Sequence, residues 1–100
     1  MIIAIDFDKT WTEDPILWLE FYKSCLLRGH RIIIATARQE RADNSDMDRY
    51  EIPSGVPVIF TNGNFKRQAC LKAGWTVDIW IDDTPSMVDP GLIINPDREL

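Results

Sequence analysis

Two pairs of carboxylates stand out as the residues that could do chemistry in this 100-residue sequence. Asp6 and Asp8 follow the apolar residues 1–5, and Asp82 and Asp83 follow another apolar run. Four acids brought close together repel one another strongly unless a cation lies among them. Carboxylate oxygens suit Mg²⁺ better than zinc. The two pairs therefore predict a magnesium site, provided that the fold brings them together.

Polar residues of other types follow the remaining apolar runs. Thr36, Ala37 and Arg38 end one run, and Lys66 stands at the start of a helical pattern. Each has a simpler interpretation by itself, because threonine favours strands and lysine usually faces solvent. Lys72 is a rival for any role given to Lys66, although it lies near the other end of the helical pattern. The joint pattern, rather than any single residue, indicates a site.

Short apolar runs that do not alternate with polar residues are typical of strands buried on both faces of a sheet. Helical patterns separate these runs, so strand and helix alternate along the chain. Such alternation predicts a parallel sheet with right-handed crossovers, in the three-layer Rossmann-like α/β class. The sheet is expected to have about five strands, over residues 1–5, 31–36, 56–60, 77–81 and 91–94.

Two helices are predicted between these strands. Asp14 and Pro15 are typical of an N-cap and a first helical residue, and Gly29 of the position just after a helix. Asn64 likewise predicts an N-cap, with Gly74 closing the second helix. Helical spacing predicts that the first helix buries Trp18, Phe21, Tyr22, Cys25 and Leu26, and the second Phe65, Ala69, Leu71 and Ala73.

The segment from Gln39 to Glu51 is polar and dense in charge, with Met47 and Tyr50 as its sizeable apolar residues. This composition predicts a short surface helix or a mobile loop. A charged run of this kind is by default a solvated face. A specificity flap over residues 39–52 is the alternative.

Size and composition predict a single cytoplasmic domain over residues 1–100. The chain is 45% hydrophobic with a net charge of −5, and its length is usual for one domain. No apolar run approaches the roughly 20 residues of a membrane helix, and the N-terminus lacks the basic start of a signal peptide. The acidic balance argues against non-specific nucleic-acid binding. Cys25 and Cys70 are expected to be buried, reduced thiols.

The order of the polar residues resembles the haloacid dehalogenase superfamily. The resemblance extends to small stand-alone members found in bacteria and phages. Many members carry a cap domain, and the segments between the motifs here are too short for one. The resemblance therefore implies a capless domain with an open site. Four motifs carry it, in order: Asp6-Phe7-Asp8-Lys9-Thr10, Thr36, Lys66 and Asp82-Asp83.

The resemblance implies a catalytic role for the matching residues. Asp6 is implied to be the nucleophile that attacks phosphorus and forms an aspartyl-phosphate. Asp8 is implied to be the general acid and then the general base. Thr36 and Lys66 are implied to bind the transferring phosphoryl group.

The same resemblance implies the metal site. Asp6 and the backbone carbonyl of Asp8 are implied ligands of Mg²⁺. Asp82 is implied to be a further direct ligand, and Asp83 to bind water coordinated to the metal.

Residues beside the motifs are candidates for binding substrate. Thr10 ends the first motif, and Ala37 offers a backbone N–H. Arg38 could bind a second phosphate or pair with an acid of the 40–51 segment. Lys9 stands where glycine is common in the superfamily, and it either reaches the phosphate or faces solvent. Trp11 could stack on a base or sugar, or pack over the edge of the sheet.

The sequence therefore predicts a Mg²⁺-dependent phosphomonoester hydrolase. Dehalogenases of this superfamily lack an acid two residues after the nucleophile, so Asp8 favours phosphoryl chemistry. The resemblance to nucleotidases and to polynucleotide phosphatases makes nucleotides or nucleic-acid ends the first substrates to test. The alternative is a non-catalytic module of the same fold that binds a phospho-ligand or a metal.

Overall fold

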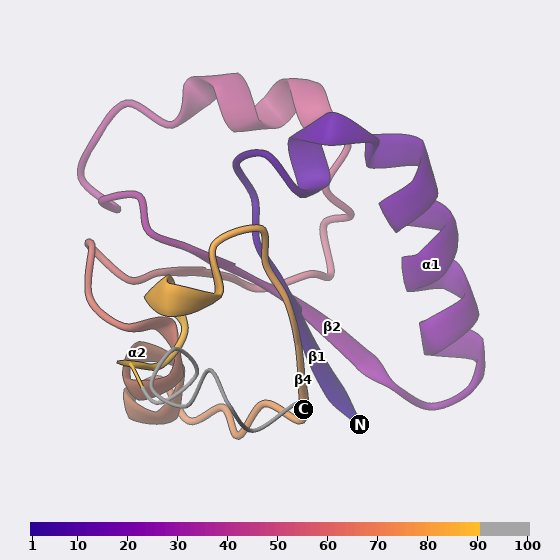
Figure 1. The fold of residues 1–100 in the computed structure, drawn as a ribbon. Coiled ribbons are helices and arrows are strands. Elements are labelled where there is room, and N and C mark those ends of the chain that lie inside the picture. The colour runs from indigo at the N-terminus through magenta and orange to yellow at the C-terminus, as the bar shows by residue number, and fades with distance from the viewer. Residues whose placement is uncertain (91–100) are drawn as a thin grey trace, which may run out of the picture.

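A parallel sheet forms the centre of the molecule, and a computed structural model describes it over residues 1–90. Its strands are β1 (Ile2–Ile5), β2 (Arg31–Thr36), β3 (Val58–Phe60) and β4 (Ile79–Ile81). They lie in the order β3-β2-β1-β4, and all neighbours are parallel (Figure 1). The predicted α/β parallel sheet is confirmed, with four strands among the described residues rather than about five. The strand predicted over residues 91–94 lies outside them.

Side chains alternate across the sheet and build two apolar cores. On one face, Ile3 and Ile34 pack in the same core as Cys25 of α1 (Pro15–Leu27), the main helix of that side. On the other face, Ala4 and Ile33 pack in the same core as Cys70 of α2 (Lys66–Lys72). These strands lack apolar–polar alternation because both faces are covered, which gives the expected three layers.

The helix α1 begins and ends where the sequence predicts. The Asp14 Oδ1 accepts the backbone N–H of Leu17 at 3.1 Å, and Pro15 is the first helical residue. Gly29 follows the helix with φ +82°, a left-handed backbone that favours glycine. Cys25 is buried, but the prediction for Leu26 is wrong, since that side chain is exposed.

The prediction for α2 is wrong about the inward face. The backbone of Phe65, not Asn64, occupies the N-cap position, and no side chain caps the helix. Phe65 and Leu71 are exposed, while Lys66 and Cys70 are buried. The helix has only seven residues, and Lys66 is drawn inward by two carboxylates. Ion pairing therefore decides which face a short helix buries.

Three short 3₁₀ helices complete the described elements: η1 (Trp11–Glu13), η2 (Ser45–Tyr50) and η3 (Pro85–Met87). The charged segment from Gln39 to Glu51 thus contains a short helix, which confirms the first of its two predicted forms. Met47 of η2 is buried in the same core as α1, and Tyr50 packs against it. In Figure 1, η2 and α1 lie on one side of the sheet and α2 on the other.

Cys25 and Cys70 are buried and unpaired thiols, as predicted. Within residues 1–90, no helix has both the length and the apolar character needed to cross a membrane.

Candidate active site

The carboxyl ends of β1 and β4 bring three of the four predicted acids together. Ile5 and Ile81 are register partners, and the backbone N–H of Asp6 donates to the Ile81 carbonyl at 2.9 Å. The chain therefore leaves both strands at the same edge of the sheet. One carboxylate oxygen from each of Asp6, Asp82 and Asp83 lies within 4.8 Å of the others.

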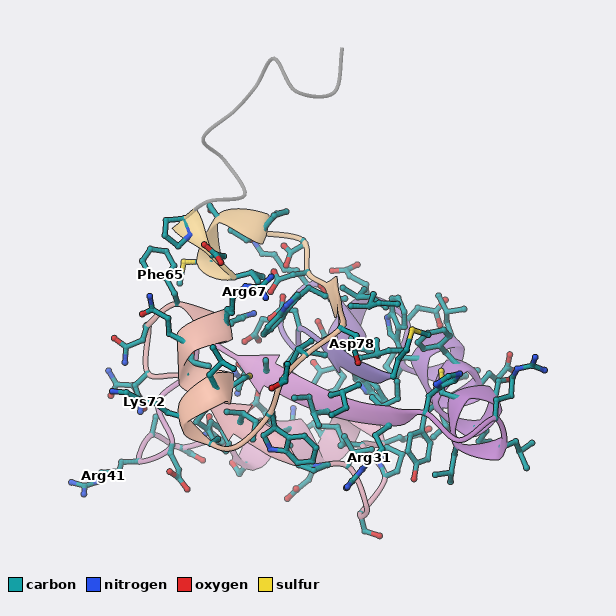
Figure 2. All side chains as sticks on the ribbon, turned by 90° about the horizontal axis from the view of Figure 1, so that it is seen from below. Arg31, Arg41, Phe65, Arg67, Lys72 and Asp78 are labelled. Carbon is teal, nitrogen blue, oxygen red and sulfur yellow. The ribbon has the colours of Figure 1, made fainter. Side chains whose placement is uncertain are left out.

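Lys66 is the cation that lies among these acids. Its Nζ donates to the Oδ1 of Asp6 and to the Oδ2 of Asp82, both at 2.6 Å. The side chain is only 2% exposed, and both of its ion-pair partners are carboxylates of the protein. Lys72, the rival in the sequence, is exposed on the outer side of α2 (Figure 2). Of the two lysines, only Lys66 contributes to the acidic cluster.

Two hydrogen-bond donors orient the cluster further. The Thr10 hydroxyl is 3.3 Å from the Oδ2 of Asp6 and 3.4 Å from the Oδ1 of Asp83. It carries one proton and can donate to one of them at a time. The backbone N–H of Thr84 donates to the Oδ1 of Asp82 at 2.8 Å. Thr10, a predicted substrate contact, thus holds acids in place.

Burial and a neighbouring acid change the protonation of Asp6. Burial and a hydrogen bond with Asp83 together raise its pKa from 3.8 to about 6, against the lowering effect of Lys66. The pKa of Asp83 is lowered, chiefly by the same hydrogen bond. Two such carboxyls share a proton when no metal competes for their oxygens.

Asp8 lies beside this cluster in a separate ion pair with Arg38. The Nε of Arg38 donates to the Oδ2 of Asp8 at 2.9 Å, and its Nη2 to the Oδ1 at 2.8 Å. Both carboxylate oxygens of Asp8 are thereby engaged. Arg38 also donates to both oxygens of Asp46 in η2, at 2.7 and 2.9 Å, and stacks over the Phe7 ring at 4.9 Å. Asp46 is the acid further along the chain that the sequence left unidentified.

Two predicted site residues are buried away from solvent. Thr36 ends β2 but is 0% exposed, and its Oγ1 accepts the backbone N–H of Arg38 at 3.3 Å. Trp11 is also 0% exposed, and its Nε1 donates to the Tyr50 carbonyl at 2.7 Å. The prediction that Trp11 stacks on substrate is therefore wrong in this arrangement, and packing over the sheet edge is right. Its indole instead joins the first motif to η2.

The acids line a cavity of about 220 Å³. Seven of its nine lining residues were candidates from the sequence: Asp6, Asp8, Lys9, Ala37, Lys66, Asp82 and Asp83. The other two, Thr84 and Met87, were missed. Thr84 directly follows the second acidic pair, a position that could have signalled it. Lys9 has φ +65°, so a side chain stands at a backbone position suited to glycine.

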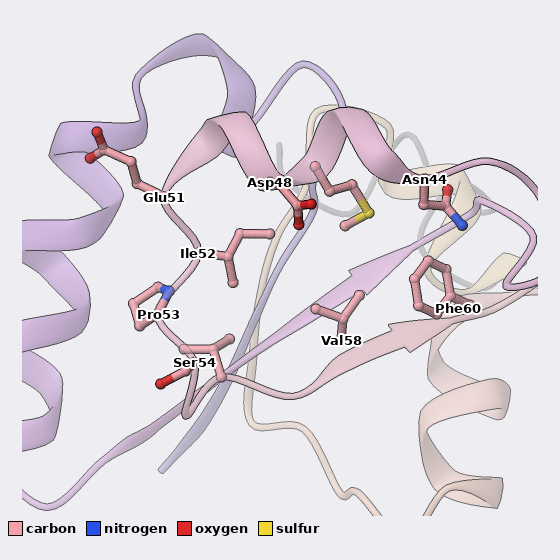
Figure 3. Close-up of a pocket in the computed structure, with 10 residues that line it drawn as sticks. Asn44, Asp48, Glu51, Ile52, Pro53, Ser54, Val58 and Phe60 are labelled. Atoms are coloured by element: carbon pink, nitrogen blue, oxygen red, sulfur yellow. The ribbon is translucent and has the colours of Figure 1, made fainter.

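A second, larger cleft of about 440 Å³ lies between η2 and β3 (Figure 3). Val58 and Phe60 of β3 point toward η2 and give the cleft an apolar floor, and Asp48 points a carboxylate toward it. Glu51 also lines the cleft, with its carboxylate turned away in Figure 3. Asn44 lines this cleft, and its Oδ1 lies 3.5 Å from the Nη1 of Arg38. A single arginine thus contacts both Asp8 and a residue of the cleft.

The donor set fits a hard divalent cation. Carboxylate oxygens converge from the ends of two strands, and a cavity beside them leaves space for water and substrate. Such oxygen ligands suit Mg²⁺, which keeps several waters when bound. A bound cation would also remove the need for Asp6 and Asp83 to share a proton. Comparison of the chain with protein-family models, curated proteins and solved structures found no match.

Proposed function

We propose that this protein is a Mg²⁺-dependent phosphomonoester hydrolase of the haloacid dehalogenase type. One observation carries the proposal. Asp6, at the end of β1, lies with two further carboxylates and a buried lysine on one cavity of about 220 Å³. A carboxylate nucleophile, a cation site and a fixed positive charge are the groups that phosphoryl transfer needs.

In the first step, an Asp6 oxygen attacks phosphorus and forms a new O–P bond, while the bond from phosphorus to the alcohol oxygen breaks. Lys66 already contacts Asp6 at 2.6 Å, so its ammonium lies where it can bind a phosphoryl oxygen beside the nucleophile. Asp6, Asp82 and the Asp8 carbonyl would bind Mg²⁺ directly, and Asp83 would bind it through water. The bound cation would neutralise phosphoryl charge. The leaving alcohol oxygen takes a proton from Asp8.

Asp8 must leave its ion pair with Arg38 before it can deliver this proton. Both carboxylate oxygens of Asp8 accept guanidinium N–H groups, so neither is free to contact a leaving group. Both partners are partly exposed, so the pair is weak enough to exchange. A substrate phosphate or negative leaving group that attracts Arg38 would release Asp8, which then takes a proton from solvent before it protonates the leaving oxygen.

In the second step, water attacks the phosphorus of the aspartyl-phosphate and gives its proton to Asp8. The bond from Asp6 to phosphorus breaks, which releases inorganic phosphate and returns both carboxylates to their first state. The two steps consume one water and transfer no electrons.

The charge around the site favours a substrate with one terminal phosphate. Lys66 and Lys9 line the cavity, whereas the cleft between η2 and β3 has an apolar floor, with the acids Asp48 and Glu51 in its lining. Arg38 links the two, because it contacts Asp8 of the cavity and Asn44 of the cleft. A base or another uncharged ring fits the cleft better than a second phosphate does. We therefore propose nucleoside monophosphates or nucleic-acid ends as the first substrates to test.

Phosphate release in the presence of Mg²⁺ tests the proposal. Wild type and Asp6→Asn are compared on mononucleotides, 3′- and 5′-phosphorylated oligonucleotides, sugar phosphates and phosphopeptides, with Glu40→Gln as an exposed control. We expect EDTA-sensitive turnover in wild type and in the control, and none in Asp6→Asn. Equal turnover in all three would overturn the nucleophile assignment. Mg²⁺-dependent ligand binding without turnover would favour the non-catalytic alternative.

A further inference from the structure

We propose that the outer face of α1 is a two-fold interface with a second copy of this chain. The helix buries Cys25 and packs Trp18, Phe21 and Tyr22 against the core. Its solvent-facing side carries apolar residues as well. Ile16 is 64% exposed and Leu27 is 89% exposed, and Leu17 and Leu26 are at least half exposed. Single exposed apolar side chains are ordinary, but four on one thirteen-residue helix indicate a contact surface.

The spacing of the exposed residues defines one stripe. Ile16, Glu20, Lys23 and Leu27 recur at intervals of four, three and four, which places them on one side of an α-helix. Apolar residues stand at the two ends of the stripe and opposite charges at its centre. Neither Glu20 nor Lys23 belongs to any of the ion pairs found within residues 1–90.

This stripe is complementary to itself when two helices run antiparallel. A two-fold axis midway between Glu20 and Lys23 brings Ile16 against the partner's Leu27. The same axis brings Glu20 against the partner's Lys23, and each contact occurs twice. A two-fold interface requires such self-complementarity, because the same patch serves both subunits. The pattern therefore favours a second copy over an unrelated partner.

The charge pattern also argues against a membrane as the partner of this helix. A helix that lies on a membrane needs an apolar face without charges along its centre. Here Glu20 and Lys23 lie in the middle of the stripe. No residue of α1 lines the cavity that holds Asp6, so pairing through this helix leaves the candidate active site open. The inference is independent of the proposed function.

The pairing is expected to be weak and dependent on concentration, because one helix from each subunit forms a small interface. Sedimentation velocity over a concentration series, on the full chain at low salt, should show a monomer–dimer equilibrium. Leu27→Asp should abolish the dimer. Leu71→Asp, at an exposed leucine of α2, is the matched control and should leave the dimer unchanged.

Charge reversal tests the register of the two helices. Glu20→Lys or Lys23→Glu alone places like charges opposite each other twice, and should weaken dimerisation about tenfold. The double variant restores opposite charges and should recover the dimer. An equal mixture of the two single variants should form a heterodimer for the same reason.

Engineered cysteines give a second, geometric test. Ile16→Cys mixed with Leu27→Cys should form a disulfide between chains. Ile16→Cys alone should not, because the two-fold places the two copies of residue 16 roughly 16 Å apart along the helices. A wild-type chain that stays monomeric at all concentrations overturns the proposal. So does a dimer that Leu27→Asp leaves intact, or a monomer that binds lipid vesicles through α1.

Discussion

Two cationic side chains each bridge a pair of acids, and they do so in opposite surroundings. Lys66 joins Asp6 to Asp82 with its side chain 2% exposed. Arg38 joins Asp8 to Asp46 at the surface, where all three side chains are partly exposed. Both bridges connect elements that are distant in the sequence.

The difference in burial gives the two bridges different tasks. Removing one partner of a buried ion pair leaves an uncompensated charge, so the Lys66 bridge is costly to open. Water and salt compete with an exposed pair, so the Arg38 bridge opens at little cost. The buried bridge suits the groups that must stay fixed around a nucleophile. The exposed bridge suits a carboxylate, Asp8, that must exchange partners and protons.

The largest effect should come from Lys66→Met. Without the ammonium, Asp6 and Asp82 face each other unpaired, and we expect a loss of about 3–5 kcal/mol in the free energy of unfolding. Urea denaturation in EDTA measures this loss. Adding Mg²⁺ should recover part of it, because the cation binds the folded state.

Lys72→Met is the matched control, since this lysine is exposed on the same helix. We expect its unfolding free energy to stay within about 0.5 kcal/mol of wild type. A Lys66→Met chain as stable as this control would remove the distinction between the two bridges.

A smaller effect should appear in the pH dependence of stability. Burial and the hydrogen bond with Asp83 raise the pKa of Asp6 from 3.8 to about 6 in the folded chain. Its contribution to stability is thus fully present below the unfolded pKa and is lost as the pH rises through about 6. Denaturation in EDTA should show stability decreasing between about pH 4 and pH 7.

Asp6→Asn should remove most of this decrease, because an amide does not titrate. The lowered pKa of Asp83 acts in the opposite direction, but below the ordinary aspartate pKa of 3.8, so it adds no slope between about pH 4 and pH 7. A wild-type profile that is flat or rises over this range would contradict the assignment of the raised pKa to Asp6.

Arg38→Met should have a modest effect on stability and a larger one on activity. The exposed bridge contributes about 1 kcal/mol or less, and that contribution should vanish in high salt. Turnover should fall because no guanidinium then positions Asp8 and η2 before the substrate binds, although the ion pair with Asp8 must open during the reaction. Denaturation with and without about 1 M NaCl, together with phosphate release, measures both. Arg41→Met, at an exposed arginine three residues further along the chain, should match wild type in both assays.

The smallest effect is expected at Lys9. Its φ of +65° destabilises a residue with a side chain by about 1 kcal/mol relative to glycine. Part of the stability gained by substituting glycine is lost again, because glycine increases the conformational entropy of the unfolded chain. Lys9→Gly should therefore change stability by less than about 1 kcal/mol, in the stabilising direction. A raised KM would show that the Lys9 ammonium contacts the substrate. An unchanged KM would show that it faces solvent.

The sequence predicted those features that local signals determine. The strand over residues 31–36 and the start of α1 at Asp14-Pro15 match the structure, because strand propensity and helix capping are local. The edge of the sheet that gathers Asp6, Asp82 and Asp83 was predicted because parallel strands share a direction.

Features that depend on distant partners were missed. The sequence named Lys66 as a site residue, but capping and spacing rules did not predict its burial in α2, because that burial results from carboxylates that follow two other strands. The tie from Trp11 to Tyr50 and the identity of Asp46 as the partner of Arg38 are equally non-local. The buried hydroxyl of Thr36 was missed because its exposure depends on the turn that follows.

Direct detection of the covalent intermediate tests the central claim. Wild-type protein is mixed with Mg²⁺ and a hydrolysed phosphomonoester, quenched in acid during turnover, digested and analysed by mass spectrometry. We predict one added phosphoryl group on the peptide that contains Asp6, localised to that carboxylate, and none in Asp6→Asn. A phosphoryl group on another residue, or turnover in Asp6→Asn at the wild-type rate, would contradict it.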